Sequence, residues 1–168
     1  MYFRIVSQCI QSLRNVETWL DKAEHSAAAK KFDADVLAAA RLAPDMQPLT
    51  GQLQSACYYV VAAAAWLSGQ KPPTHEDNEK SMSELRARIA KTIAFAESVT
   101  KEQYKGAASQ TVSISWKPGK IIAGEDYIVQ MTIPNVYFHL VMVYAILRHN
   151  GVDVGKMDYL GPMNFVAA

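Results

Sequence analysis

The chain has 168 residues, of which half are hydrophobic and 20% are charged, and its 17 Lys and Arg residues nearly balance its 16 Asp and Glu residues. This length is typical of one domain, here 1–168, which buries enough surface to fold without a disulfide or a structural metal. The balanced charge argues against a nucleic-acid-binding protein, which normally carries a basic excess on one face.

The first segment predicts an amphipathic helix over about residues 2–25, because apolar residues recur there at steps of three and four. This stripe consists of Phe3, Val6, Ile10, Leu13, Val16 and Leu20. Arg4 and Arg14 interrupt the apolar run, so the N-terminus does not resemble a secretion signal.

Two cysteines, Cys9 and Cys57, lie in different apolar segments without the spacing of a redox motif. A bond between them would require the first two helices to touch, whereas free cysteines usually behave as small buried hydrophobes. We therefore expect reduced thiols in a cytoplasmic protein.

The second helix is expected from about Asp45, which could cap it, to about Leu67, with Pro48 in its first turn. A stop follows at 71–73, and the acidic residues at 76, 77 and 79 suit the positive end of a third helix. Leu85, Ile89, Ile93 and Ala96 form the buried stripe of that helix, and Arg88 is expected mostly off the stripe.

Residues 106–124 change to a period of two and contain a turn at 117–120, which predicts a short β-hairpin. A fourth helical segment begins near Gly124 or Glu125 and ends before Gly151. Pro134 lies inside it, so either the helix kinks or a short leading turn precedes a main helix from about 134 to 149. The expected architecture is all-α, an antiparallel four-helix bundle with mostly short connections and a hairpin between the third and fourth helices.

Two stretches, 46–70 and 127–147, contain no charged residue. Their length would suit membrane spans, but each carries several amides, and one a His, that would need partners in lipid. We therefore expect no membrane insertion and two helices shielded by the bundle. A homodimer that uses part of the second or fourth helix would cover the remaining apolar surface.

The few polar residues on these helices are the candidate ligand-binding site. Asn135 and His139 are one turn apart on the fourth helix, and Gln52 and Tyr59 share a face of the second helix with Ser55. Facing each other, these side chains could form a polar pocket in the bundle interior. The alternative is a single buried His139 satisfied by local hydrogen bonds. His75, beside two acidic residues, is interpreted as part of a solvated helix start, and no catalytic residue is identified.

Several short runs carry a family resemblance. They are Arg-Leu-Ala-Pro-Asp-Met at 41–46, Gln-Leu-Gln at 52–54, Glu-Leu-Arg-Ala-Arg-Ile at 84–89, Pro-Asn-Val-Tyr-Phe-His at 134–139, Leu-Arg-His-Asn-Gly at 147–151, and Gly-Lys-Met-Asp-Tyr-Leu-Gly at 155–161. Together they resemble a domain-of-unknown-function family, over about residues 1–161, that looks like a branch of the DinB/YfiT-like four-helix-bundle superfamily of proposed metalloenzymes.

The resemblance implies a divalent metal, often nickel or zinc, held by one His on the second helix and a His-x-x-x-His pair on the last. His139 matches the second His of that pair. Asn135 stands at the first, and Gln52 or a neighbour stands at the helix-two position. Because amide oxygens are poor ligands for these metals, we expect no firmly bound cofactor and at most weak binding of Ni²⁺ or Zn²⁺ at His139.

Three functional hypotheses follow. The first is a small-molecule-binding bundle with a degenerate metal site at His139, Asn135, Gln52 and Tyr59. The second, implied by the resemblance, is a metal- or thiol-dependent transferase or isomerase with His139 as ligand or general base. The third is a structural or interaction protein without catalysis.

Overall fold

The computed structural model describes residues 1–167, and most of them are helical. The α-helices are α1 (Tyr2–Lys30), α2 (Leu49–Leu67), α3 (Met82–Ser98), α4 (Gly124–Asp126), α5 (Ile133–His149) and α6 (Lys156–Leu160). The short elements are the 3-10 turns η1 (Ala34–Ala39), η2 (Lys101–Tyr104) and η3 (Ala107–Ser109), the strands β1 (Thr111–Ser113) and β2 (Ile121–Ala123), and the π-helix η4 (Tyr127–Thr132). The prediction of a mostly helical protein with one small antiparallel sheet is confirmed, although the described residues contain six α-helices.

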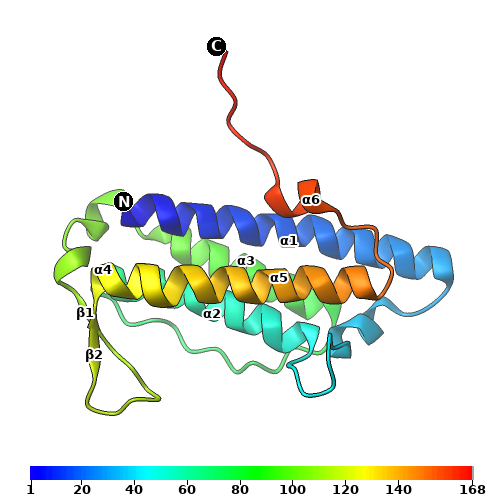
Figure 1. Cartoon of the computed structure of the whole chain (residues 1–168), viewed down its shortest axis with the longest axis horizontal. Helices are drawn as coiled ribbons and strands as arrows, with labels where there is room; N and C mark the ends of the chain where they lie inside the picture. Colours follow the sequence, from blue (N-terminus) through cyan, green and yellow to red (C-terminus); the bar gives the residue numbers. More distant parts are fainter. Residues whose placement is uncertain (168) are drawn as a thin grey trace.

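The four long helices lie side by side in two parallel pairs, which differs from the expected wholly antiparallel arrangement. Figure 1 shows α1 and α5 running in one direction and α2 and α3 in the other. The ion pairs between α1 and α3 confirm an antiparallel pair, because Arg86 contacts Asp21 whereas Glu97, about three turns later, contacts Arg14.

The helices α2 and α3 run parallel because of the connection between them. Residues 70–80 form no helix and run back along the bundle (Figure 1). An extended chain covers about 3.3 Å per residue, so this strap spans more than the roughly 26 Å length of the 17-residue α3. The proline pair at 72–73 thus belongs to a long crossover rather than to a tight turn.

The strap also moves the start of the third helix. The expected acidic helix start at 76–79 is wrong, because α3 begins at Met82. Ser81 caps it: the Ser81 hydroxyl accepts the Glu84 N–H, and the Glu84 carboxylate accepts the Ser81 N–H at 3.0 Å. The second helix likewise begins at Leu49 rather than near Asp45, because a residue that precedes a proline, here Gln47, disfavours helical geometry.

The fourth helical segment adapts to Pro134 without a break. The π-helical turn η4 leads into α5, whose first turn contains Pro134. Because Pro134 has no N–H to donate to the turn before it, the run accommodates it with the wider π-helical turn, and the regular helix that follows matches the expected main helix from about 134 to 149. The two strands before it pair in antiparallel register, with Val112 opposite Ile122.

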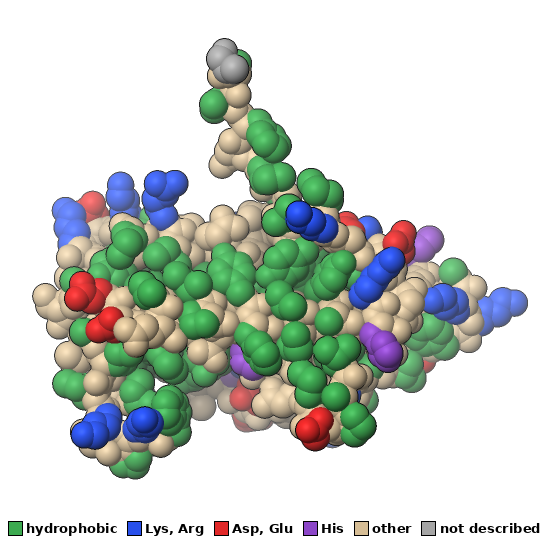
Figure 2. Space-filling model, in the orientation of Figure 1, with side chains coloured by type: hydrophobic (Ala, Val, Ile, Leu, Met, Phe, Trp, Pro, Cys, Tyr) green, Lys and Arg blue, Asp and Glu red, His purple; other side chains and the backbone are tan. Residues whose placement is uncertain are grey.

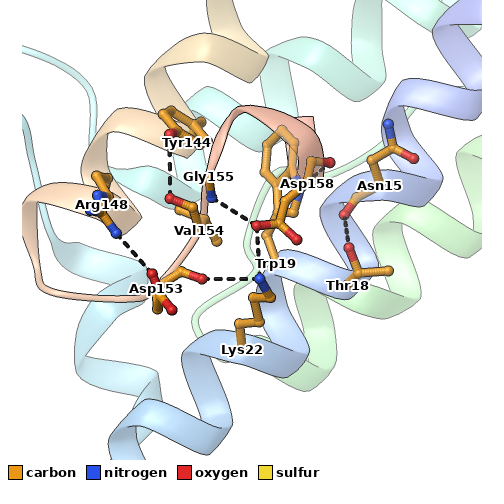
Figure 3. A network of polar contacts seen from close by, with 10 residues as sticks. All are labelled: Asn15, Thr18, Trp19, Lys22, Tyr144, Arg148, Asp153, Val154, Gly155 and Asp158. Atoms are coloured by element: carbon orange, nitrogen blue, oxygen red, sulfur yellow. Dashed lines mark hydrogen bonds and ion pairs between the residues drawn. The ribbon is translucent and has the colours of Figure 1, made fainter. Parts of the chain in front are cut away.

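The C-terminal segment after α5 is fastened to α1 (Figure 3). The Trp19 indole donates to the Asp158 carbonyl at 2.9 Å, and the Lys22 ammonium donates to the Asp158 carboxylate at 2.7 Å. The Asn15 amide donates to the Tyr159 carbonyl at 3.1 Å. These bonds hold α6 over the outer face of α1, and the chain then projects away from the body (Figure 1).

The core fills the space between the long helices, and both cysteines lie within it. Cys9 and Cys57 are free, each no more than 1% exposed. Burial raises the pKa of the Cys9 thiol to about 12 and that of the Cys57 thiol to about 11. Both thiols therefore stay protonated at neutral pH and act as packing residues.

Candidate functional site

The polar pair expected between the second and fourth helices is formed. The Nδ1 atom of His139 in α5 lies 2.8 Å from the Oε1 atom of Gln52 in α2. Gln52 is 2% exposed, and its Nε2 donates to the Gln47 carbonyl at 3.3 Å. That second bond orients the amide so that Oε1 faces the imidazole, and Nδ1 must carry the proton it donates.

This geometry sets the state of His139. Burial lowers the pKa of the imidazole below its usual value, so the ring is neutral at pH 7. With the proton on Nδ1, the Nε2 atom keeps its lone pair. His139 can therefore accept a hydrogen bond or a proton at Nε2 while Gln52 holds the ring in place.

Aromatic rings hold the imidazole from two sides. The Tyr59 ring stacks on it at a centroid distance of 6.0 Å, and the Phe138 ring meets it edge-on at 5.2 Å. Tyr58 in turn packs edge-on against Tyr59 at 5.2 Å. The imidazole orientation is thus determined by both packing and hydrogen bonding.

His139 opens onto a pocket of about 420 Å³ between α2, α5 and the strap. The lining residues are Gln47, Gly51, Gln54, Ser55, Tyr58, Tyr59, Asp77 and His139. Most of the lining is polar or aromatic, with one carboxylate. The lining thus presents hydrogen-bonding groups and flat aromatic faces to the space between them.

The sequence-predicted residues differ in their relation to this pocket. His139 and Tyr59 line the pocket, and Gln52 supports His139 from behind. Asn135 instead donates its amide to the Met131 carbonyl of its own helical segment at 2.7 Å, and the described lining does not include it. A local bond of this kind satisfies the amide without a ligand.

The strap contributes a wall that the sequence analysis did not identify. Arg88 of α3 is 3% exposed and lies 2.7 Å from the Asp77 carboxylate and 3.0 Å from the Glu79 carboxylate. Gln54 donates to the other Glu79 oxygen at 2.8 Å. Asp77 adopts a left-handed backbone conformation, with a φ of 52°, that faces its side chain toward Arg88 and the pocket.

The expectation that Arg88 lies off the buried stripe is therefore wrong. Arg88 comes three residues after Leu85 and four before Thr92, which are both fully buried, so helical spacing alone places it on the same face. Nor does His75 belong to a helix start, because it lies in the strap with a buried Nε2. The sequence feature that could have predicted this ion-pair cluster is a charged residue at a core position of a helix, with three carboxylates just before that helix.

A second cavity of about 190 Å³ lies beside the first, beneath the hairpin. Ile114 and Trp116 form one wall, and Tyr127 of η4 another. Tyr58 and Tyr59 line both cavities, so the two are separated by those rings. The hairpin thus covers an aromatic space next to the His139 pocket.

The donors at this site do not suit a zinc or nickel ion. The described residues contain no group of three or more His, Cys, Asp and Glu side chains that could hold a metal. The one His at the site has an amide as its neighbour, and the Gln52 oxygen already accepts the bond from His139. Borderline metals favour imidazole and thiolate over such amide oxygens.

Comparisons with known proteins agree with the resemblance. The model of a domain-of-unknown-function family, DUF1993, matches residues 1–160. A crystal structure of a DinB family member protein from Shewanella denitrificans is 40% identical, with a TM-score of 0.94, and the match covers 99% of this chain and 95% of that chain. No curated protein matches the chain. The chain therefore belongs to the DUF1993 family, a family of unknown function whose fold is that of a DinB family member.

Proposed function

We propose that this protein is a DinB-like four-helix bundle that binds a small molecule in the pocket between α2 and α5, without a firmly held metal. The supporting observation is the neutral His139, whose Nδ1 is bound to buried Gln52 and whose ring forms a wall of the 420 Å³ pocket. Fixing an imidazole in one tautomer restricts its freedom before a ligand arrives, which favours binding.

Within the pocket His139 would accept a hydrogen bond at Nε2 from an N–H or O–H group of the ligand. The amides of Gln47 and Gln54 and the Ser55 hydroxyl offer further polar contacts on the α2 side. The Tyr59 ring offers a face for a planar group. We place this function in the cytoplasm, with a small molecule rather than a nucleic acid as the partner.

Ligand-observed NMR screening of a library of small polar molecules tests the proposal. The NMR signal of binding should disappear with His139→Ala. It should weaken with Gln52→Leu, because this change removes the acceptor that keeps the proton on Nδ1. Asn135→Ala is the matched control on the same helix, and it should bind as the native protein does because Asn135 bonds to its own backbone. Binding that survives His139→Ala would place the ligand elsewhere.

The pH dependence provides an independent readout. Because the pKa of His139 is lowered by burial, the neutral ring predominates at pH 7 and is protonated only in more acidic solution. Protonation turns the Nε2 acceptor into a donor, so binding should weaken as the pH falls below that pKa. Binding unchanged between neutral and acidic pH would contradict acceptance at Nε2.

The alternative function, a metal- or thiol-dependent transferase or isomerase of the DinB-like type, rests on the family likeness. It requires a metal at His139, which the amide neighbour does not favour. Elemental analysis of protein purified without a His-tag or chelator separates the two. A stoichiometric nickel or zinc content that is lost with His139→Ala would support the enzyme, whereas substoichiometric metal would support the binding protein.

A further inference from the structure

The helical run Gly124–His149 is less buried than its apolar composition would lead us to expect. It is the one helical run in the described residues that is long and apolar enough to cross a membrane, yet only 28% of its most apolar window is buried. By contrast, most residues of the other charge-free helix, α2, are buried. The structure thus leaves the surplus apolar surface on α5 and its leading turn.

The exposed residues form one straight stripe. Phe138 is 53% exposed, Val141 is 40% exposed, and Pro134 and the half-buried Ala145 extend the line at steps of four and three. This spacing is that of a coiled-coil seam. Val129, 55% exposed, lies five residues before Pro134, and the wide turn of a π-helix brings such a pair onto the same face.

The charges at the two ends of the run have opposite signs. Glu125 and Asp126 are exposed at its start, and the Arg148 side chain, 57% exposed, lies at its end. In the orientation of Figure 1, where α5 faces the viewer, Figure 2 shows hydrophobic side chains gathered over this helix with acidic groups at its left end. Arg148 forms an ion pair with the fully exposed Asp153 at 3.1 Å, and an exposed pair of this kind contributes little to stability.

We propose that this stripe is the interface of a homodimer in which two copies of α5 pack antiparallel about a twofold axis near Phe138. An axis there brings the Arg148 of each copy opposite residue 128 of the other, within reach of Asp126. An antiparallel copy of the same helix therefore matches both apolar seam and end charges.

A lipid bilayer is a poorer occupant of this surface. The opposite face of the same helix, with Val136, Leu140 and Val143 fully buried, packs into the core. Insertion of α5 would strip that core from the other three long helices. The exposed stripe covers only one side of the helix, whereas a membrane-spanning helix would have to face lipid or protein on every side.

The interface formed by one pair of helices is expected to be small, and small interfaces are typical of weak complexes. A run of 26 residues is about 39 Å long, and one helix pair buries less than the roughly 800 Å² per partner of a standard interface. We therefore expect a dimer that dissociates on dilution through the micromolar range.

Sedimentation velocity of the full chain over a concentration series tests the interface. The native protein should be dimeric at high concentration, and Val141→Lys should be monomeric throughout with an unchanged circular dichroism spectrum. Val36→Lys is the matched control, because Val36 is 59% exposed on η1, away from the stripe. A native protein that stays monomeric, or a dimer disrupted only by Val36→Lys, would overturn the proposal.

A charge swap tests the antiparallel arrangement. Arg148→Asp and Asp126→Arg should each weaken the dimer about fivefold to tenfold by placing like charges together, and the double variant should restore it. A double variant as weak as the two single changes combined would exclude the antiparallel pairing. Flotation of a monomeric native protein with phosphatidylcholine vesicles would instead assign the stripe to a membrane surface.

Discussion

Replacing Arg88 by Met should cost about 3 kcal/mol of unfolding free energy. Its guanidinium is 3% exposed and pairs with two carboxylates, of which Glu79 is 13% and Asp77 is 55% exposed. Removing one partner of a buried ion pair typically costs about 3–5 kcal/mol, because the other charge stays buried without compensation. The half-exposed Asp77 can be rehydrated, so the lower end applies.

Urea unfolding at pH 7, followed by circular dichroism, measures this change. Arg14→Met is the matched control, since Arg14 and its partner Glu97 are both more than 40% exposed and their pair should contribute at most about 1 kcal/mol. The double variant Arg88→Met/Glu79→Gln should lose clearly less than Arg88→Met alone, because neither charge is then left buried. Strictly additive losses, or an Arg88→Met protein as stable as the control, would refute a stabilising buried ion pair between Arg88 and Glu79.

The same pair predicts a dependence on pH. Burial works to raise the pKa of Glu79, but hydrogen bonds that include those from Gln54 and Arg88 outweigh it and hold the pKa below its usual value. A depressed folded-state pKa contributes stability that is present above the unfolded value of about 4.3 and is lost as the pH falls through the folded value. Glu79→Gln should therefore flatten the stability profile in acid, and an unchanged profile would contradict the assignment.

Two further outcomes are expected. Gly161→Ala should destabilise the protein by about 1–2 kcal/mol in thermal or urea unfolding. The reason is that Gly161 has a φ of 67° and that an added Cβ would lie 2.3 Å from the Asn15 amide. The control Gly155→Ala, whose added Cβ would have only a 3.8 Å contact, should change the stability little. Neither Cys9 nor Cys57 should react with Ellman's reagent in the folded protein, and both should react in guanidinium; rapid labelling of the native protein would show that the thiols are accessible.

The helices were predictable where one periodic pattern decided them. The apolar stripe of α1 repeats from Phe3 to Leu20, so the sequence located the helix and missed only its last five residues, which end at Lys30. The start of α2 was misplaced because Pro48 disfavours helical geometry at Gln47. The start of α3 was misplaced because the acidic residues before it lie in the strap, where Asp77 and Glu79 pair with Arg88. Local capping rules cannot distinguish a carboxylate at a helix start from one that pairs with a distant Arg88.

Some residues of the candidate site also stand out in the sequence, whereas their partners do not. Polar residues are rare on the charge-free helices, so His139, Gln52 and Tyr59 were recognisable without a structure. Asn135 shares a face with His139 by spacing, but its amide bonds to the nearby Met131 carbonyl instead. Spacing determines which side chains share a helix face, but it does not determine the hydrogen-bond partner of each side chain.

The sequence by itself determined the helical class, the charge-free pair of helices and the polar residues that stand out on them, because each of these depends on neighbours within a few turns. Only the tertiary structure decided that α2 is buried while α5 keeps an exposed stripe, and that the strap brings Asp77 to the His139 pocket. The second result depends on the crossover that makes α2 and α3 run parallel, because Asp77 is part of it. A crossover of this kind depends on contacts between residues far apart in the chain, and these are absent from any local pattern.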